Sequence, residues 1–236
     1  MVNNRQESLI TLANPRSPVS EAYRTLRTNL EFSSLDRPIK TMVVTSPGPE
    51  EGKSTTLANL AVAMAQAGKR VILVDCDLRR PSQHQIFDVR NGRGLTTMMV
   101  DEEAMKNPPF QKIEIDGAEG SLHLLPSGPL PPNPAELLAS RRMTEIIKSL
   151  AEQSDIVLFD APPIIAVTDA ALLSSKVDAV LLVINAGGTK REHAQSAKTL
   201  LEKVNARLVG VVLNNVRFDS SLHRYYAEQE KSSSRD

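Results

Sequence analysis

Short apolar runs alternate with longer helical stretches along most of the chain. The runs are rich in β-branched residues, and they occupy residues 42–45, 71–74, 122–125, 156–159, 180–184 and 209–213. The helical stretches cover about residues 53–67, 134–151, 168–175 and 190–205. Continuous apolar runs without alternation are typical of strands buried on both faces, as in a parallel sheet. Strands that alternate with helices predict right-handed βαβ units wound on both sides of that sheet. The predicted fold class is therefore α/β, a doubly wound and mostly parallel sheet in a single domain.

The two ends of the chain depart from this pattern. Residues 1–16 are polar and predict a flexible N-terminal arm, and residues 217–236 predict a flexible tail. Between them, residues 17–216 predict the main domain, which opens with an amphipathic helix over residues 17–33. Residues 101–120 are polar and predict an excursion on the surface.

The composition narrows the class of protein. The 236-residue chain has 41% hydrophobic but only 3% aromatic residues, which predicts a sizeable aliphatic core. Its 28 basic and 28 acidic residues balance, so charge gives no reason to expect nucleic acid as a partner. The one cysteine, Cys76, excludes an internal disulfide and suits a reducing cytosol. Because there is neither a signal peptide nor an apolar run of membrane-spanning length, we expect a cytoplasmic protein that reaches a membrane only through a partner.

Ligands of such sheets bind beyond the carboxyl ends of the strands, and the first candidate segment lies there. Residues 46–55 read Ser-Pro-Gly-Pro-Glu-Glu-Gly-Lys-Ser-Thr and open a helix, whose N–H groups and dipole favour phosphate. Gly52 permits close approach, Lys53 can reach the β- and γ-phosphates, and the Ser54 hydroxyl can ligate Mg²⁺. The P-loop pattern has a glycine where Pro47 stands, so a chance Gly-Lys-Ser turn is the alternative for this segment alone. The predicted nucleotide-binding residues of the loop are Gly48, Glu51, Gly52, Lys53, Ser54 and Thr55.

Two further predicted strands end in acidic residues. Asp75 and Asp77 close one strand, where two carboxylates are costly unless a cation or hydrogen bonds offset them. They predict a metal site or a base toward a hydroxyl, with a helix cap and a turn acid as the alternative. Asp160 closes another strand, at the place where P-loop enzymes hold Mg²⁺. The three segments together, in this order, predict a protein that binds ATP and Mg²⁺.

Two additional segments make a family resemblance specific. Residues 125–140 read Leu-Pro-Ser-Gly-Pro-Leu-Pro-Pro-Asn-Pro-Ala-Glu-Leu-Leu-Ala-Ser, and Glu21, Arg24 and Arg27 form a Glu-x-x-Arg-x-x-Arg pattern. With the Asp-x-Asp-x-Arg-x-Pro and Asp-x-Pro-Pro segments, the chain resembles the bacterial tyrosine kinases of capsule and exopolysaccharide production. The resemblance covers roughly residues 18–226.

The resemblance implies an ATP-dependent protein-tyrosine kinase that phosphorylates itself. It implies catalytic roles for Lys53, Asp75 and Asp77, in which the lysine contacts the phosphates and the acids position metal or deprotonate the attacking tyrosine. It implies Mg²⁺ near Ser54, Asp75 and Asp160.

The resemblance also implies partners. Glu21, Arg24 and Arg27 would join subunits of a homo-oligomeric ring, although the residues alone favour a solvated face with an internal Glu21–Arg24 pair. A membrane-spanning activator with a cytoplasmic tail would recruit the chain to the inner face of the membrane, and a cognate tyrosine phosphatase would oppose the kinase. In related ATPases an asparagine after the last strand lies near adenine, so Asn214 is the candidate, with a turn residue as the alternative.

Two features depart from the family pattern. Glu50 stands where the family has a glycine in the phosphate loop, and we expect its side chain to point outward. The family's run of C-terminal tyrosines is reduced here to Tyr225 and Tyr226, which are the predicted phosphoacceptors, with packing on the edge of the domain as the alternative.

Two other functions remain open. The first is an ATPase switch like those that position division sites or partition DNA, but Gly48 stands where those proteins carry a lysine. The second is a nucleotide-binding assembly factor of a polysaccharide export complex.

Overall fold

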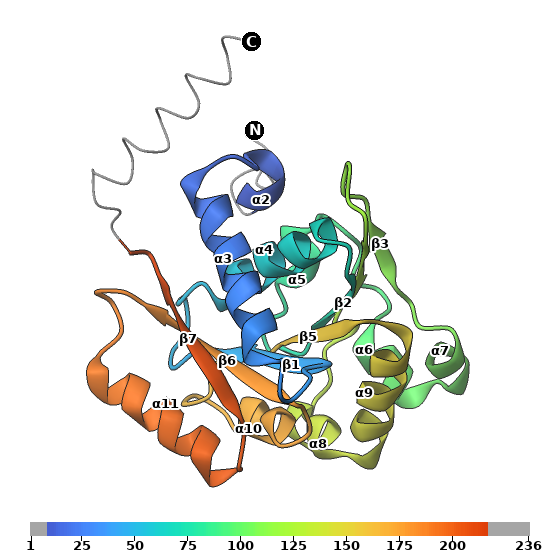
Figure 1. Ribbon diagram of the computed structural model, residues 1–236. Coiled ribbons are helices and arrows are strands. Elements are labelled where there is room, and N and C mark those ends of the chain that lie inside the picture. Colours follow the sequence, from blue (N-terminus) through green and yellow to red (C-terminus); the bar gives the residue numbers. More distant parts are fainter. Residues whose placement is uncertain (1–8, 217–236) are drawn as a thin grey trace.

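Seven strands form one sheet in the order β3-β4-β2-β5-β1-β6-β7 (Figure 1). The strands are β1 (Thr41–Thr45), β2 (Arg70–Asp75), β3 (Gln111–Ile113), β4 (Ser121–Leu125), β5 (Ile156–Asp160), β6 (Ala179–Asn185) and β7 (Leu208–Asn214). All neighbouring strands run parallel except the β3–β4 pair, which is antiparallel. The computed structural model describes residues 9–216. The predicted fold class is confirmed, and each of the six apolar runs forms a parallel strand.

Helices cover both faces of the sheet. They are α2 (Ile10–Ala13), α3 (Pro18–Ser33), α4 (Lys53–Gln66), α5 (Gln83–Ile86), α6 (Leu95–Val100), α7 (Glu102–Lys106), α8 (Pro134–Ala139), α9 (Arg141–Gln153), α10 (Asp169–Ser174) and α11 (Arg191–Lys203). One apolar cluster joins α3 and α4 to the sheet, and a second joins α9, α10 and α11 to the opposite face.

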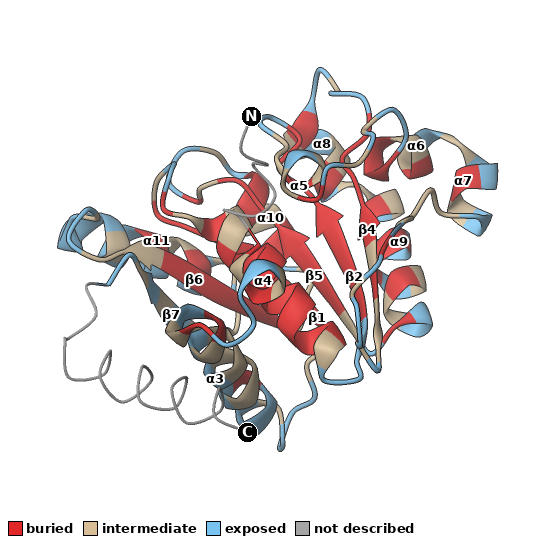
Figure 2. Ribbon diagram, turned by 90° about the horizontal axis from the view of Figure 1, so that it is seen from above, coloured by how far each residue is buried: buried red, intermediate tan, exposed pale blue. Residues whose placement is uncertain are grey.

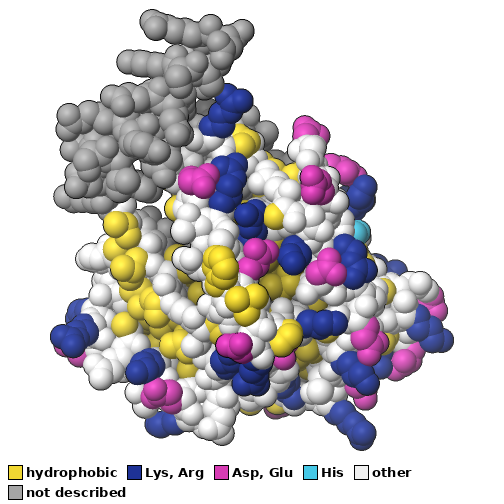
Figure 3. Space-filling view, viewed as in Figure 1, with side chains coloured by type: hydrophobic (Ala, Val, Ile, Leu, Met, Phe, Trp, Pro, Cys, Tyr) yellow, Lys and Arg dark blue, Asp and Glu magenta, His cyan; other side chains and the backbone are white. Residues whose placement is uncertain are grey.

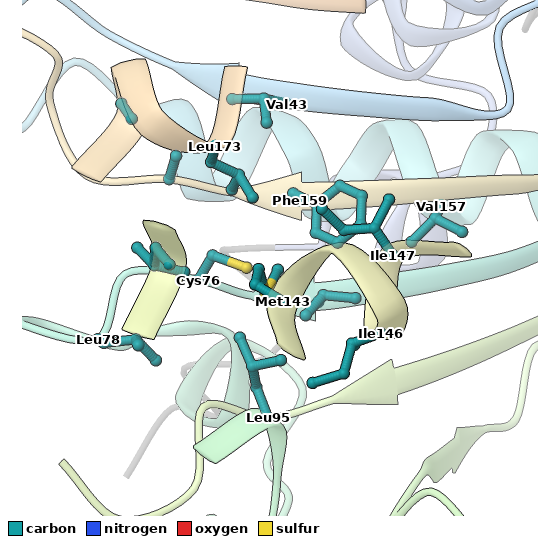
Figure 4. Packing of buried hydrophobic residues seen from close by; sticks show 14 of the residues in the cluster. Val43, Cys76, Leu78, Leu95, Met143, Ile146, Ile147, Val157, Phe159 and Leu173 are labelled. Carbon is teal, nitrogen blue, oxygen red and sulfur yellow. The ribbon is translucent and has the colours of Figure 1, made fainter. Parts of the chain in front are cut away.

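The central strands are buried on both faces, as Figure 2 shows. In β1, Met42 and Val44 face the cluster under α4, while Val43 faces the cluster under α9. Cys76 is fully buried among the aliphatic side chains of the second cluster, close to Met143 (Figure 4).

The structure divides one predicted helix and shows short elements within the predicted surface segment. The predicted helix over residues 134–151 is divided at Ser140, because this residue has extended backbone angles and its hydroxyl accepts the Met143 N–H at 3.2 Å as the N-cap of α9. The polar segment 101–120 contains α7 and the short edge strand β3, which lie in the surface excursion.

The N-terminal segment also differs from the extended arm that its polarity suggested. From Leu9, which is 1% exposed, the chain forms α2 and packs on α4. The backbone N–H and hydroxyl of Thr11 donate to Asn59 Oδ1 at 3.0 and 2.9 Å. Residues 1–8 of the predicted arm and the predicted tail lie outside the described residues. Among residues 9–216, we find no helix with the length and apolar character needed to cross a membrane.

Candidate functional site

The phosphate-loop segment (residues 46–55), the segment that ends in Asp75 and Asp77, and the segment that ends in Asp160 meet at the carboxyl ends of three adjacent strands. The sheet order places β5 between β1 and β2, and Asp75 lies directly beside Asp160 in the strand register. The loop after β1 leads into α4, whose first residue is Lys53. The Lys53 Nζ donates to Asp160 Oδ1 at 2.9 Å and to Asp77 Oδ2 at 3.2 Å. Residues that are up to 107 positions apart therefore form one buried cluster.

The loop before α4 has the backbone form of an anion-binding nest. Glu50 and Gly52 both have positive φ, +59° and +81°, while the first α4 bond runs from the Thr56 N–H to the Gly52 carbonyl. The preceding N–H groups have no partner within the helix, and their dipole end favours a bound phosphate. The Glu50 side chain is exposed, as the sequence led us to expect. A Cβ at Gly52 would lie 2.0 Å from Asn214 Nδ2, so a larger residue here would displace the Asn214 side chain from the Glu51 carbonyl.

Negative charge exceeds positive charge in the cluster. Burial lowers the pKa of Lys53, but the charges of Asp160 and Asp77 outweigh burial and raise it above its usual value. Burial, and next the Asp160 carboxylate, raise the pKa of Asp75 to about 8. Because one ammonium lies among three acidic side chains, a further cation would relieve the repulsion that favours the protonated form of Asp75.

The oxygen atoms of this cluster suit a Mg²⁺ ion that is shared with substrate phosphates better than a metal ion that is bound only by protein side chains. Ser54 Oγ lies 3.0 Å from Lys53 Nζ, so hydroxyl and carboxylate oxygens converge there. In the part of the chain that the structure describes, no three His, Cys, Asp or Glu side chains are arranged to hold a metal. Mg²⁺ characteristically keeps several waters and uses one or two carboxylates together with substrate phosphates.

Asp75 organises the loop that follows β2. Its carboxylate accepts the N–H groups of Asp77 at 3.2 Å, Ser82 at 3.0 Å and Gln83 at 2.9 Å. In this arrangement its oxygen atoms are occupied by backbone donors, so direct metal ligation by Asp75 stays a prediction. Asp77 is placed nearer to Lys53, whose ammonium it contacts.

Glu51 ties the phosphate loop to the neighbouring strands, although the sequence placed it among the nucleotide-binding residues without this reason. The side chain is buried, and its two oxygens accept the Gly48 N–H at 3.0 Å and the Asn185 N–H at 2.8 Å. The hydroxyl of Thr189 donates to the same carboxylate. The Glu51 carbonyl accepts Asn214 Nδ2 at 3.0 Å, so β6 and β7 are both connected to the loop. Asn185 and Thr189 carry no motif and were missed by sequence reasoning.

Sequence reasoning also missed the contacts of two polar side chains in the loop after β2 and at the start of α5. Gln83 Nε2 donates to Asp160 Oδ2 at 2.7 Å and to the Ser54 carbonyl at 3.1 Å. Arg79 makes a two-pronged ion pair with the buried Asp169, at 2.9 and 3.0 Å, which holds the loop after β2 against α10. The arginine of the Asp-x-Asp-x-Arg pattern was a signal for the second contact, whereas a single glutamine gave no signal for the first.

The predicted oligomerisation residues lie on α3, away from the acidic cluster. Arg24 pairs with Glu21 at 2.7 Å and donates to the Pro15 carbonyl at 2.6 Å, and Arg27 donates to the Ala63 carbonyl at 3.2 Å. These are contacts within the chain, and the internal Glu21–Arg24 pair is the alternative that the residues alone favoured.

A groove of about 460 Å³ separates α3 from the end of β7 and reaches the phosphate-loop helix. Tyr23, Thr56 and Asn214 line it, and the exposed side chains of Val211 and Leu213 lie along its β7 side. In Figure 3, apolar side chains gather where β7 lies in Figure 1. Burial raises the pKa of Tyr23, which also hydrogen-bonds to Thr56. Tyr225 and Tyr226, the predicted acceptors, lie outside the described residues.

The phosphate loop and the parallel sheet are those of a nucleotide-binding protein, and the comparison with known families agrees. Residues 42–235 match the family described as the CobQ/CobB/MinD/ParA nucleotide binding domain. The chain is 43% identical to the tyrosine-protein kinase YwqD of Bacillus subtilis over 95% of this chain and 93% of that protein. This chain therefore belongs to the bacterial tyrosine-protein kinases, within that wider nucleotide-binding family.

One further relative is much longer than its match to this chain, and one solved kinase domain has a similar structure. The tyrosine-protein kinase wzc of Salmonella typhimurium is 32% identical over 90% of this chain, but the match spans only 29% of wzc. The solved kinase domain of the Escherichia coli tyrosine kinase ETK superposes with a TM-score of 0.83 at 30% identity, covering 90% of this chain and 82% of that one.

Proposed function

We propose that this chain is an ATP- and Mg²⁺-dependent protein-tyrosine kinase that phosphorylates Tyr225 and Tyr226 of its own tail and thereby regulates capsular or exopolysaccharide synthesis or export. The observation that carries the proposal is the buried contact of Lys53 with Asp77 and Asp160 at the N-terminus of α4. A lysine, a hydroxyl and paired acids at a phosphate-binding helix end are the parts that phosphoryl transfer requires.

Lys53 has a role in binding and in the transition state. Its ammonium is held by two carboxylates, and phosphate oxygens would compete with them for the same three donors. The N–H groups at the start of α4 would hold the phosphates, and Ser54 and Asp160 would face the metal. Bound Mg²⁺ supplies positive charge that offsets the charge developing on the transferred phosphoryl group.

Asp77 is the stronger candidate for the base that receives the tyrosine proton. Its side chain contacts Lys53 and accepts one backbone N–H, that of Arg80, whereas the Asp75 carboxylate accepts three. The tyrosine oxygen would form a bond to the γ-phosphorus, the bond to the β,γ-bridging oxygen would break, and the proton would pass to Asp77. ADP and phosphotyrosine are the products.

The nucleoside has room beside the phosphate loop. The groove next to Asn214 and Thr56 opens at the loop and is partly apolar, which suits a purine ring. Asn214 would contact the adenine from the end of β7.

The remaining parts of the proposal concern assembly. Residues 17–216 are the kinase domain, with residues 17–33 as an oligomerisation helix. Glu21, Arg24 and Arg27 would exchange their internal contacts for a neighbouring subunit in a ring. A membrane-spanning activator with a cytoplasmic tail would recruit the kinase to the inner face of the membrane, and a tyrosine phosphatase would reverse the modification.

Incubation of the purified chain with Mg·ATP, followed by mass spectrometry of the tail peptide, tests the proposal. The activator's cytoplasmic tail is added in a parallel sample. We expect phosphate on Tyr225 or Tyr226, lost in Lys53→Met and retained in Lys69→Met, whose lysine is half exposed after α4. ATP hydrolysis without phosphotyrosine in either sample would refute the kinase and favour the ATPase switch or assembly factor.

A further inference from the structure

Gln83 is a fully buried polar side chain that contacts the predicted metal-binding acid. Its exposed fraction is 0%, and its Nε2 donates to Asp160 Oδ2 at 2.7 Å and to the Ser54 carbonyl at 3.1 Å. Ser54 lies in the first turn of α4 and Asp160 ends β5, so one amide group connects the phosphate-loop segment to the segment that ends in Asp160. The first contact is charge-assisted, which makes it the stronger of the two.

The orientation of this amide is determined by its neighbours. Both atoms that Nε2 contacts are oxygens without a proton to give, so rotation of the amide by 180° would place oxygen against oxygen. The Gln83 Oε1 must therefore point away from them. It is buried and has no hydrogen-bond donor among the residues that the structure describes. A buried acceptor of this kind is unfavourable when it is left unpaired.

The backbone of Gln83 is held as firmly as its side chain. Its N–H and that of Ser82 donate to Asp75 Oδ2 at 2.9 and 3.0 Å. Asp75 thus fixes the start of α5, and α5 in turn presents the Gln83 amide to Asp160. Asp75 is therefore connected to Asp160 through the backbone and the side chain of Gln83.

We propose that Gln83 is a positioning residue of the divalent-cation site: its Nε2 orients the Asp160 carboxylate, and its Oε1 accepts a hydrogen bond from a water ligand of the bound cation. A water bound to Mg²⁺ is a strong donor, and it would supply the partner that Oε1 lacks. Residues that orient metal ligands in this way typically change metal affinity about 10–100-fold when they are replaced. The inference rests on the proposed function only in requiring that the chain bind Mg²⁺ with a nucleotide.

Calorimetric titration with ADP, once with Mg²⁺ and once with a chelator, tests the inference without relying on catalysis. We expect Gln83→Met to weaken ADP binding about 10-fold with Mg²⁺ and to change it less than about twofold without metal. Gln85→Met is the matched control, because Gln85 is exposed on the same short helix α5, and it should leave both affinities unchanged. An equal loss with and without Mg²⁺, or no loss, would overturn the inference.

A second variant covers the case in which Gln83→Met does not fold. Gln83→Asn keeps the amide but withdraws it by one methylene, so we expect the same loss that appears only with Mg²⁺. If Gln83→Asn binds Mg·ADP as the unaltered chain does, the inference is wrong while the proposed function stands. If Mg²⁺ does not strengthen ADP binding to the unaltered chain, the proposed metal site itself fails.

Discussion

Replacement of Glu51 by alanine should release the phosphate loop from the sheet. The carboxylate is 6% exposed and accepts two backbone N–H groups, from Gly48 and Asn185, together with the Thr189 hydroxyl. In Glu51→Ala the Gly48 N–H loses its acceptor, whereas the Asn185 N–H keeps the Thr189 hydroxyl oxygen as an acceptor at 3.1 Å. An unpaired buried donor costs about 1–3 kcal/mol, and the Gly48 N–H is only partly buried. The Asn185 N–H and the Thr189 hydroxyl also lose their bonds to a charged acceptor. We therefore expect the free energy of unfolding to fall by about 1–3 kcal/mol.

Urea unfolding without nucleotide measures this change, provided that the slope with denaturant stays the same. Glu50→Ala is the matched control: this adjacent glutamate is exposed, and its replacement should change stability by less than about 0.5 kcal/mol. Thr189→Val removes the hydroxyl alone and should cost about 1 kcal/mol. The reasoning is refuted if Glu51→Ala is no less stable than Glu50→Ala.

Three further predictions concern the loop and the acids. Gly52→Ala should abolish ADP binding in calorimetry and lower the free energy of unfolding by more than about 1 kcal/mol. The reason is that its Cβ would meet Asn214 Nδ2 at 2.0 Å and that φ is +81° at this residue. Normal ADP binding by this variant would contradict the clash. Glu50→Gly should raise stability by about 1 kcal/mol in urea unfolding, since φ is +59° there, and a loss of stability would refute strain at this residue. The folded state keeps a proton on Asp75 up to about pH 8, whereas the unfolded chain releases it near 3.8, so its contribution to metal-free stability falls as pH rises through that window. Because a bound cation requires ionised carboxylates, the increase in melting temperature on adding Mg²⁺ should be larger near about pH 9 than near about pH 6, and an equal increase would argue against this role of the acids.

The fold could be predicted because its determinants are local. Six apolar runs without alternation became the six parallel strands, since strands covered on both faces have no polar side to display. The edge strand β3 was not predicted, because three residues paired on one side carry too short a pattern. The burial of Leu9 also escaped prediction: the apolar residues around it form too short a run to give a period, although Leu9 lies in the apolar cluster of α4.

The site was predictable only where a motif marks it. Lys53, Asp77 and Asp160 were found from strand ends and spacing, and the structure brings them within hydrogen-bonding distance. Gln83 and Thr189 depend on which elements the fold places side by side, and no pattern along the chain records that. The roles assigned to the predicted residues remain proposals that the experiments above address.

The position of β5 has a consequence for the order in which the chain can fold. β1 and β2 follow each other in sequence but do not pair, because β5 lies between them and pairs with both. A nascent chain that ends before residue 156 therefore carries Lys53, at the start of the helix after β1, and Asp75, at the end of β2, with no strand to bridge β1 and β2. Closing such long loops costs entropy before any contact repays it, which slows folding. The ligand-binding centre can form only after β5 has left the ribosome, so nucleotide can stabilise a chain that extends beyond β5 but not its N-terminal half.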